Sequence, residues 1–123
     1  LAMFAQAQPR LRPPRDLDCP RDQLTLYQGE VIGYTRADGR TTLRIGTDWQ
    51  TIEQVGIAHP GSDDPSPWFR IADAHPFSAA DWPRIEISNG RLRSGVRVAA
   101  WVCADARNPT VQWTVPSVGS GTR

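Results

Sequence analysis

The chain has 123 residues, enough for one domain with a modest buried core. Its formal net charge of +1 gives no electrostatic reason to expect a polyanionic partner such as nucleic acid. No apolar run of about 18 residues occurs, so the sequence predicts no membrane span.

The first segment is interpreted as the end of an export signal followed by a tether. Ala5-Gln6-Ala7 matches the A-x-A pattern of a signal-peptidase site, which assigns residues 1–7 to the signal. Residues 8–22 are rich in proline and arginine, a composition that favours an extended, solvated linker. This interpretation predicts a periplasmic or secreted protein, with ordinary N-terminal padding as the alternative.

Cys19 and Cys103 are the only two cysteines. In an exported protein such a pair predicts a disulfide, which here would join the start of the first strand to the end of a late strand. Closing so long a loop is worth about 4 to 5 kcal/mol in the chain-entropy model. Two free thiols or a metal pair are the alternatives, although zinc is disfavoured because no C-x-x-C spacing occurs.

A three-stranded meander is predicted between residues 23 and 57. It begins with Gln23–Thr35, which is rich in β-branched and aromatic residues. Asp38-Gly39 follows, a pair typical of a tight hairpin turn because glycine readily takes a positive φ and aspartate tolerates it.

The rest of the meander is predicted from alternation. Apolar and polar residues alternate over Thr42–Trp49, as expected of a strand with one buried face. In the third run Ile52 and Val55 differ in parity, which predicts a bulge between them.

Residues 59–77 form the longest irregular stretch and hold both histidines. His59, Asp63 and His75 are weak candidates for a metal or acid–base site. Each histidine precedes a proline, however, and no spacing matches a recognised metal motif. The favoured interpretation is a turn-rich loop pinned to the core by Trp68. No cofactor, metal or catalytic residue is predicted.

The last third of the chain is predicted to contain one short helix and three strands. Ser78 and Asp81 form a capping-box pattern at a helix start, and Pro83 keeps the helix short. Asn89-Gly90 predicts a second tight turn. Trp101 and Trp113 are expected in the core. The expected strands are residues 84–88, the central strand 96–103, and 111–115.

The predicted order, a meander followed by a helix and two or three strands, is mainly β. It resembles the OB-fold, a five-stranded, partly open Greek-key barrel, with the helix between strands 3 and 4. Leu92-Arg93-Ser94-Gly95-Val96-Arg97-Val98 looks like the L-x-x-G-x-x-V start of the fourth strand of such barrels. The resemblance implies a five- to six-stranded barrel over residues 23–116. Residues 117–123 are rich in glycine and serine, which predicts a flexible tail. Another small barrel or sandwich is the alternative.

Exported OB-like modules include a haem chaperone whose haem histidine lies in a C-terminal H-x-x-x-Y motif. No histidine follows His75 here, so that activity is not expected. The resemblance instead implies ligand binding on the face of strands 2 and 3. Arginines and aromatic residues on or near that face are the predicted binding residues, since both types are common at interfaces: Tyr34, Arg36, Arg40, Arg44, Trp49 and Trp68.

The sequence therefore predicts a non-enzymatic binding or accessory module of the cell envelope, whose partner is a protein or a small or oligomeric ligand. A small enzyme or metal protein using the loop from His59 to His75 is one alternative, although neither G-x-S-x-G nor H-E-x-x-H occurs. Single-stranded nucleic-acid binding is another, disfavoured by the low charge. No oligomeric state is predicted.

Overall fold

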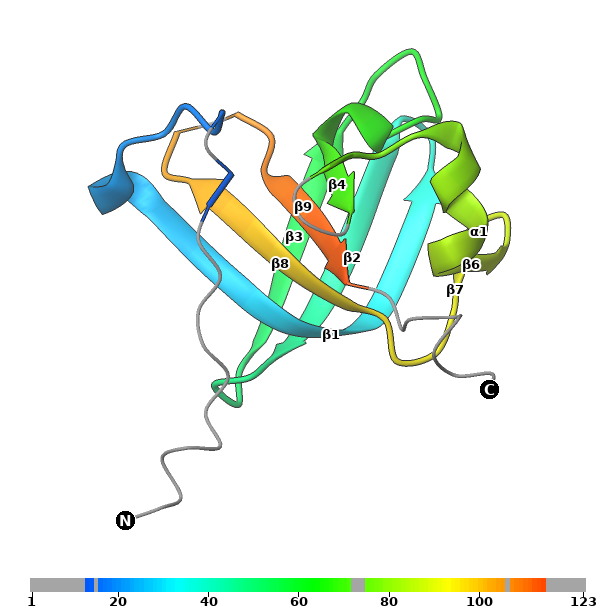
Figure 1. Ribbon diagram of the computed structural model, residues 1–123, viewed down its shortest axis with the longest axis horizontal. Helices are drawn as coiled ribbons and strands as arrows, with labels where there is room; N and C mark the ends of the chain where they lie inside the picture. The colour runs from blue at the N-terminus through cyan, green and yellow to red at the C-terminus, as the bar shows by residue number, and fades with distance from the viewer. Residues whose placement is uncertain (1–12, 15, 72–74, 106, 115–123) are drawn as a thin grey trace.

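Nine strands make up most of the described part of the chain, which in this computed structural model comprises residues 13–14, 16–71, 75–105 and 107–114 (Figure 1). The mainly β class is thus confirmed. One short helix, α1 (Trp82–Ile85), and three 3₁₀ turns, Arg21–Gln23, Ser66–Trp68 and Ala79–Asp81, complete these residues. The strands are β1 (Leu24–Ala37), β2 (Arg40–Thr47), β3 (Ile52–Ala58), β4 (Phe69–Ile71), β5 (His75–Pro76), β6 (Glu86–Ser88), β7 (Arg91–Leu92), β8 (Arg97–Cys103) and β9 (Thr110–Thr114).

β1 is the strand on which the sheet is built. Its first half pairs with β8 from Leu24 to Glu30, and its second half pairs with β2 up to Ala37. The two-residue turn Asp38-Gly39 joins β1 to β2 with positive φ at both positions, as predicted.

The bulge lies in β1 and not in β3. The register of β1 against β2 shifts between Val31 and Gly33, whereas β2 and β3 pair without a shift. The prediction of a bulge between Ile52 and Val55 is therefore wrong. The prediction assumed that Ile52 and Val55 are both buried, but Ile52 is 60% exposed on the outer face, so their difference in parity needs no bulge.

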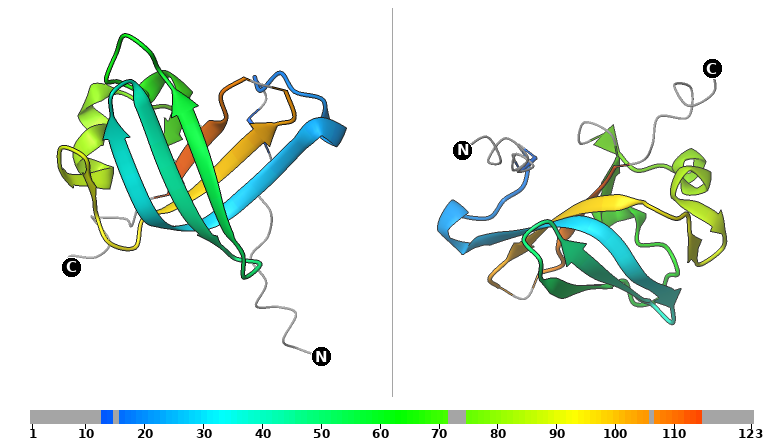
Figure 2. Two further views of the ribbon diagram at one scale, coloured as in Figure 1. Left: turned by 180° about the vertical axis from the view of Figure 1, so that it is seen from behind. Right: turned by 90° about the horizontal axis from the view of Figure 1, so that it is seen from below.

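The main sheet has the strand order β3-β2-β1-β8-β9-β4-β5, and β6 and β7 form a separate pair. All neighbours in the main sheet are antiparallel except β4 and β9, which are parallel. In the described residues the sheet does not close on itself, because β3 and β5 remain its two edges. Figure 2 shows that the sheet curls strongly, so that its inner face encloses the core.

The main core lies inside this curl. Leu43 and Ile45 of β2 are fully buried, in agreement with the predicted alternation. Phe69 joins β4 to the core by packing edge-on against Phe77 and Trp113. The core cluster comprises Leu43, Ile45, Val55, Ile57, Phe69, Ile71, Phe77, Ile85, Val96, Val98, Ala100, Val111 and Trp113.

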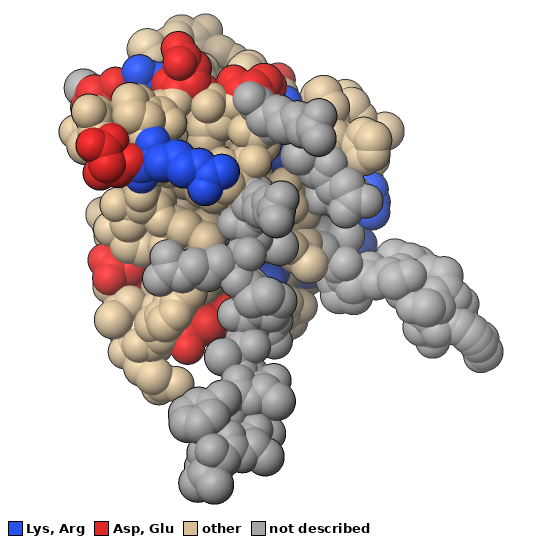
Figure 3. Space-filling view, turned by 60° about the vertical axis from the view of Figure 1, so that its left-hand side comes forward, with Lys and Arg blue, Asp and Glu red and all other residues tan. Residues whose placement is uncertain are grey.

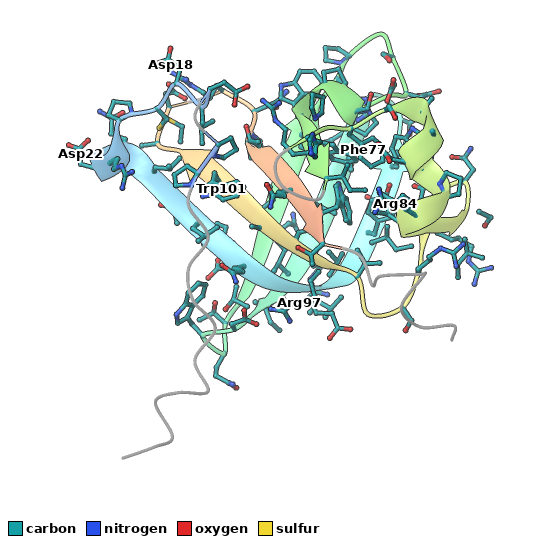
Figure 4. The ribbon with its side chains drawn as sticks, in the orientation of Figure 1. Asp18, Asp22, Phe77, Arg84, Arg97 and Trp101 are labelled. Carbon is teal, nitrogen blue, oxygen red and sulfur yellow. A yellow bond between two sulfur atoms is a disulfide. The ribbon has the colours of Figure 1, made fainter. Side chains whose placement is uncertain are left out.

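The described part of the N-terminal segment covers the other face of the sheet. It lies over the end of β8, on the side of the sheet opposite the main core (Figures 1 and 2). Arg70 of β4 donates to Asp16 at 2.6 Å, and Arg107 donates to the carbonyl of Asp18. Trp101 alternates with the inward Ala100, so it belongs to this second face, where it is only 2% exposed (Figure 4).

The predicted disulfide between Cys19 and Cys103 is present, with 6.0 Å between the Cα atoms. Cys103 ends β8 and pairs with Leu24, the first residue of β1. The bond therefore ties the N-terminal segment to the start of the long strand, as predicted. Residues 1–12 lie outside the described part of the chain, and so do the predicted signal remnant and the tail at 117–123.

Two predicted segments take a different structure. Arg84 and Ile85, predicted as the start of a strand, belong to α1, because Pro83 lies in the first turn of the helix and does not end it. The irregular stretch 59–77 contains the short strand β4, which pairs with β9 and is too short to show a periodic pattern. Within the described residues no helix is long and apolar enough to span a membrane.

Candidate functional site

A cluster of three hydrogen-bonded side chains stands at the end of the sheet next to α1. Glu86 accepts hydrogen bonds from the Tyr34 hydroxyl at 2.6 Å and from Arg36 Nε at 3.1 Å, both on Oε2. Its other oxygen, Oε1, accepts from Arg36 Nη2 at 2.9 Å. The ion pair is largely withdrawn from water, since the Arg36 and Glu86 side chains are only 13% and 5% exposed.

Arg36 makes two further hydrogen bonds. Nη2 donates to the Asn89 side chain, and Nη1 donates to the backbone carbonyl of Asp63 at 3.3 Å. The guanidinium carbon lies 4.3 Å from the ring centre of Trp82, a cation–π arrangement. The Arg36 guanidinium thus contacts four residues that are far from it in the sequence: Asp63, Trp82, Glu86 and Asn89.

The electrostatics fix the protonation of this cluster. Burial, together with the hydrogen bond to Glu86 and its negative charge, raises the pKa of Tyr34 far above its usual range. Burial alone would lower the pKa of Arg36, but the hydrogen bonds to Glu86 and Tyr34 raise it overall. At neutral pH the phenol is therefore a proton donor and the guanidinium carries its charge.

Local structure explains why these side chains meet. Arg36 stands one residue before the end of β1, just ahead of the hairpin turn. Asp81 accepts hydrogen bonds from Ser78 N and Oγ at 2.9 and 3.1 Å, so the predicted capping pair is present. The helical segment that it starts carries Trp82 and leads directly into Glu86.

Trp82 fixes this helical segment on the core. Its ring centre lies 4.9 Å from that of Phe77 and 5.9 Å from that of Phe69. Figure 4 shows Phe77 between the sheet and α1. Because Trp82 also lies beneath Arg36, the cluster stands on a rigid aromatic base.

Next to the cluster is a pocket of about 540 Å³, which we call the Arg36 pocket. Trp82, Pro83 and Ile87 give it an apolar wall, and Ile87 is 60% exposed. The Arg36 pocket is lined by Arg36, Asp63, Asp64, Trp82, Pro83, Glu86, Ile87, Ser88 and Asn89. Its volume falls within the usual range for small-ligand sites.

The predicted binding residues separate into groups in the structure. Tyr34 and Arg36 belong to the cluster. Arg40 lies over Gly56, and Arg44 lies over Gly33, on the outer face of the meander. Trp49 is 42% exposed in the turn after β2. Trp68 packs against the core from the 3₁₀ turn Ser66–Trp68.

His59 has a structural role. It is 3% exposed, and its Nδ1 donates to the Ser62 carbonyl at 2.8 Å. Its Nε2 forms a hydrogen bond with the Thr41 hydroxyl at 2.8 Å. Both ring nitrogens are therefore engaged.

The other predicted metal candidates do not gather around His59. His75 is exposed in β5, where it pairs with Ile71. Asp63 lines the Arg36 pocket. Among the residues that the structure describes, no group of three or more His, Cys, Asp and Glu side chains could hold a metal.

Glu86, Trp82 and Asn89 are the site residues that the sequence analysis missed. Glu86 lies between Ile85 and Ile87, so alternation predicts an outward, solvated carboxylate. The helix ends at Ile85 and changes the facing of these residues, which buries Glu86 and exposes Ile87. No local pattern marks this reversal.

The chain matches no protein-family model, no curated protein and no solved structure. Its function is therefore inferred from the geometry described above.

Proposed function

We propose that this chain is a non-enzymatic, exported binding module that takes a ligand into the Arg36 pocket. The observation that carries the proposal is the pocket itself, in which an apolar wall meets charged side chains on a rigid base. We assign the binding site to this pocket instead of the face of strands 2 and 3, because Arg36 lines it and Tyr34 belongs to the adjoining cluster, while Arg40 and Arg44 lie on the outer face.

Binding is favoured over catalysis because the reactive groups of the cluster are already engaged. Both oxygens of Glu86 accept hydrogen bonds, and the Tyr34 proton is held between phenol and carboxylate. A general base needs a free acceptor within reach of the substrate proton. The carboxylate of Glu86 is instead a fixed part of the pocket lining, which suits recognition.

The charges of the lining suggest the chemistry of the ligand. Glu86 neutralises Arg36, which leaves the exposed carboxylates of Asp63 and Asp64 at the rim. A cationic group with a hydrocarbon stem would place its charge beside these carboxylates and its stem along Pro83 and Ile87. A lysine or arginine side chain of a partner protein has this form, and so does a small organic cation.

The topology supports an OB-like architecture as part of the proposal. β1, β2 and β3 form a meander, and β8 returns after a long connection to lie beside β1. The resulting spatial order β8-β1-β2-β3 is that of a Greek key. The parallel pairing of β4 with β9 extends the sheet further round its curl, as a partly open barrel requires.

The disulfide supports export, since such bonds persist in oxidising compartments and are rare in the cytosol. The charge distribution favours a protein or small-molecule partner over a nucleic acid. On the face drawn in Figure 3, acidic and basic side chains are interspersed and do not form one basic surface.

The test is a titration of the oxidised protein with a capped Gly-Arg-Gly tripeptide, followed by NMR. We expect shifts at the Trp82 indole N–H and at Ile87, and none with a capped Gly-Glu-Gly tripeptide. The double variant Asp63→Asn/Asp64→Asn should lower the affinity at least about tenfold, whereas the exposed Asp22→Asn should not. Equal responses to the two peptides, or no response to either, would refute the proposed site.

A further inference from the structure

β3 is an open edge of the sheet, and its hydrogen bonds to β2 determine which of its backbone groups point outward. Thr47 N donates to the Thr51 carbonyl, and His59 N donates to the Gly39 carbonyl. In an antiparallel ladder the paired and unpaired residues alternate. It follows that Glu53, Val55 and Ile57 bond to β2, while the residues between them point their N–H and C=O groups away from the sheet.

The outward row of β3 consists of Ile52, Gln54, Gly56 and Ala58. Only Ala58 has its outward groups satisfied in the described structure: its N–H donates to Asn108 Oδ1 at 3.0 Å, and its carbonyl accepts from Asn108 Nδ2 at 2.7 Å. The Asn108 amide thus takes the place of a neighbouring strand at one end of the edge. Ile52, Gln54 and Gly56 remain as an unpaired edge, which we call the β3 edge.

The β3 edge is accessible and carries few of the usual features that prevent strand addition. Ile52 is 60% exposed, and Gln54 is exposed. The strand has no proline, no lysine and no bulge, and Figure 2 shows β3 as the outermost strand of the meander. An edge with these properties is a template for another strand.

We propose that the β3 edge pairs with the β3 edge of a second copy of this chain, antiparallel and centred on Gln54. In this register Gln54 faces Gln54 of the other copy, and Ile52 faces Gly56 of the other copy. The facing row carries no charge, so no like charges oppose each other. Each facing pair exchanges two backbone hydrogen bonds, and Asn108 ends the ladder at Ala58.

Side-chain volume supports this self-pairing. The large, exposed Ile52 would lie beside Gly56, which has no side chain and whose nearest neighbour on that face is the far end of the Arg40 side chain. Ile32, 49% exposed, packs on Gly46, the residue paired with Ile52. The pairing would therefore extend an apolar strip that each copy now leaves open to water.

The experiment measures the mass of the oxidised full chain by sedimentation equilibrium across about a hundredfold range of concentration. We expect the wild type to shift from monomer to dimer. Gln54→Pro removes the central outward N–H without breaking a bond to β2, so it should remain monomeric. Gln54→Thr keeps that N–H and should dimerise like the wild type.

Ile52→Lys provides a second route, because a charge on the edge blocks pairing while the fold is kept. It decides the question if Gln54→Pro fails to fold. Amide exchange at Gln54 and Gly56 should also slow as the wild-type concentration rises. A monomer throughout the range, or dimerisation of Ile52→Lys equal to that of the wild type, would overturn the proposal.

Discussion

Glu86 is the residue on which the candidate site depends, because it neutralises a guanidinium that has left most of its water. We expect Glu86→Gln to lower the free energy of unfolding by about 2 to 4 kcal/mol, since the amide keeps the shape but leaves the charge of Arg36 uncompensated. Urea denaturation measures this loss.

The matched control for this substitution is Glu30→Gln, at an exposed position of β1. It should change stability by no more than about 0.5 kcal/mol. Equal effects of the two substitutions would mean that the Arg36–Glu86 pair does not form as described.

Because of Tyr34, the stability of the protein should depend on pH in the alkaline range. In the unfolded chain the phenol ionises near pH 10, whereas in the folded protein its pKa is raised, so the folded state keeps the proton longer. The stability that this provides is complete below pH 10 and is lost as the pH rises further. The wild type should lose up to about 1.4 kcal/mol more per pH unit above 10 than Tyr34→Phe.

Denaturation curves of both proteins between pH 9 and pH 11, taken in steps of about half a unit, test this dependence. At neutral pH the substitution should cost only about 1 kcal/mol, because Glu86 keeps its bonds to Arg36. Parallel pH profiles of the two proteins would show that Tyr34 ionises as freely when folded as when unfolded.

At this scale the sequence points to only half of the site. Tyr34 and Arg36 could be named because an aromatic residue and an arginine at the end of a predicted strand are typical binding residues. Glu86 could not, because its separation from Arg36 by 50 residues leaves no local signal. Its burial follows from where α1 ends, which tertiary packing decides.

At the scale of elements, β1 pairs with both β2 and β8, and glycine at position 29 allows β2 to approach it closely. A Cβ at Gly29 would collide with the backbone of Gly46 and Thr47 in β2. Gly29→Ala should therefore lower stability by about 1 to 3 kcal/mol. Thermal unfolding monitored by circular dichroism gives the measurement.

Gly46→Ala is the comparison, since a Cβ there would meet only ordinary contacts at 3.5 Å or more. It should change stability by less than about 1 kcal/mol, because the added methyl meets no close contact and the strand position is already ordered by two neighbours. If Gly46→Ala were the more harmful change, the close crossing of β1 over β2 would be wrongly placed.

Local sequence patterns predict a turn or strand well only where neighbouring residues alone determine its conformation. The Asp38-Gly39 turn is encoded in two residues, and Leu43 and Ile45 show their burial by alternation. At Asn89-Gly90 a turn also forms, but only Gly90 has a positive φ, and the Asn89 side chain binds Arg36. There the turn is shaped by a contact that the local sequence does not contain.

At the scale of the whole molecule, the sheet has buried residues on both faces. The disulfide tethers the N-terminal segment, which lies on the second face. The sequence predicts the Cys19–Cys103 bond from the pair of cysteines and the expected export signal. It does not predict that the described residues before Cys19 lie against the second face of the sheet, because the proline and arginine content of this segment is that of a solvated linker. The ion pair of Asp16 with Arg70 and the burial of Trp101 depend on tertiary placement.

Removing the disulfide tests how much this arrangement depends on a covalent tie. The bond closes a loop with a sequence separation of 84, so the double variant Cys19→Ser/Cys103→Ser should lose about 4 kcal/mol through the greater freedom of its unfolded chain. Reduced wild type should match the variant, and a reductant should leave the variant unchanged.

Because Cys103 ends β8 beside Leu24, loss of the disulfide should first release the N-terminal segment and raise the solvent exposure of Trp101. Quenching of tryptophan fluorescence by acrylamide follows that exposure, whereas the Arg36 pocket, at the other end of the sheet, should keep its titration with the arginine tripeptide. A loss of peptide binding on reduction would show instead that the two faces of the sheet are coupled.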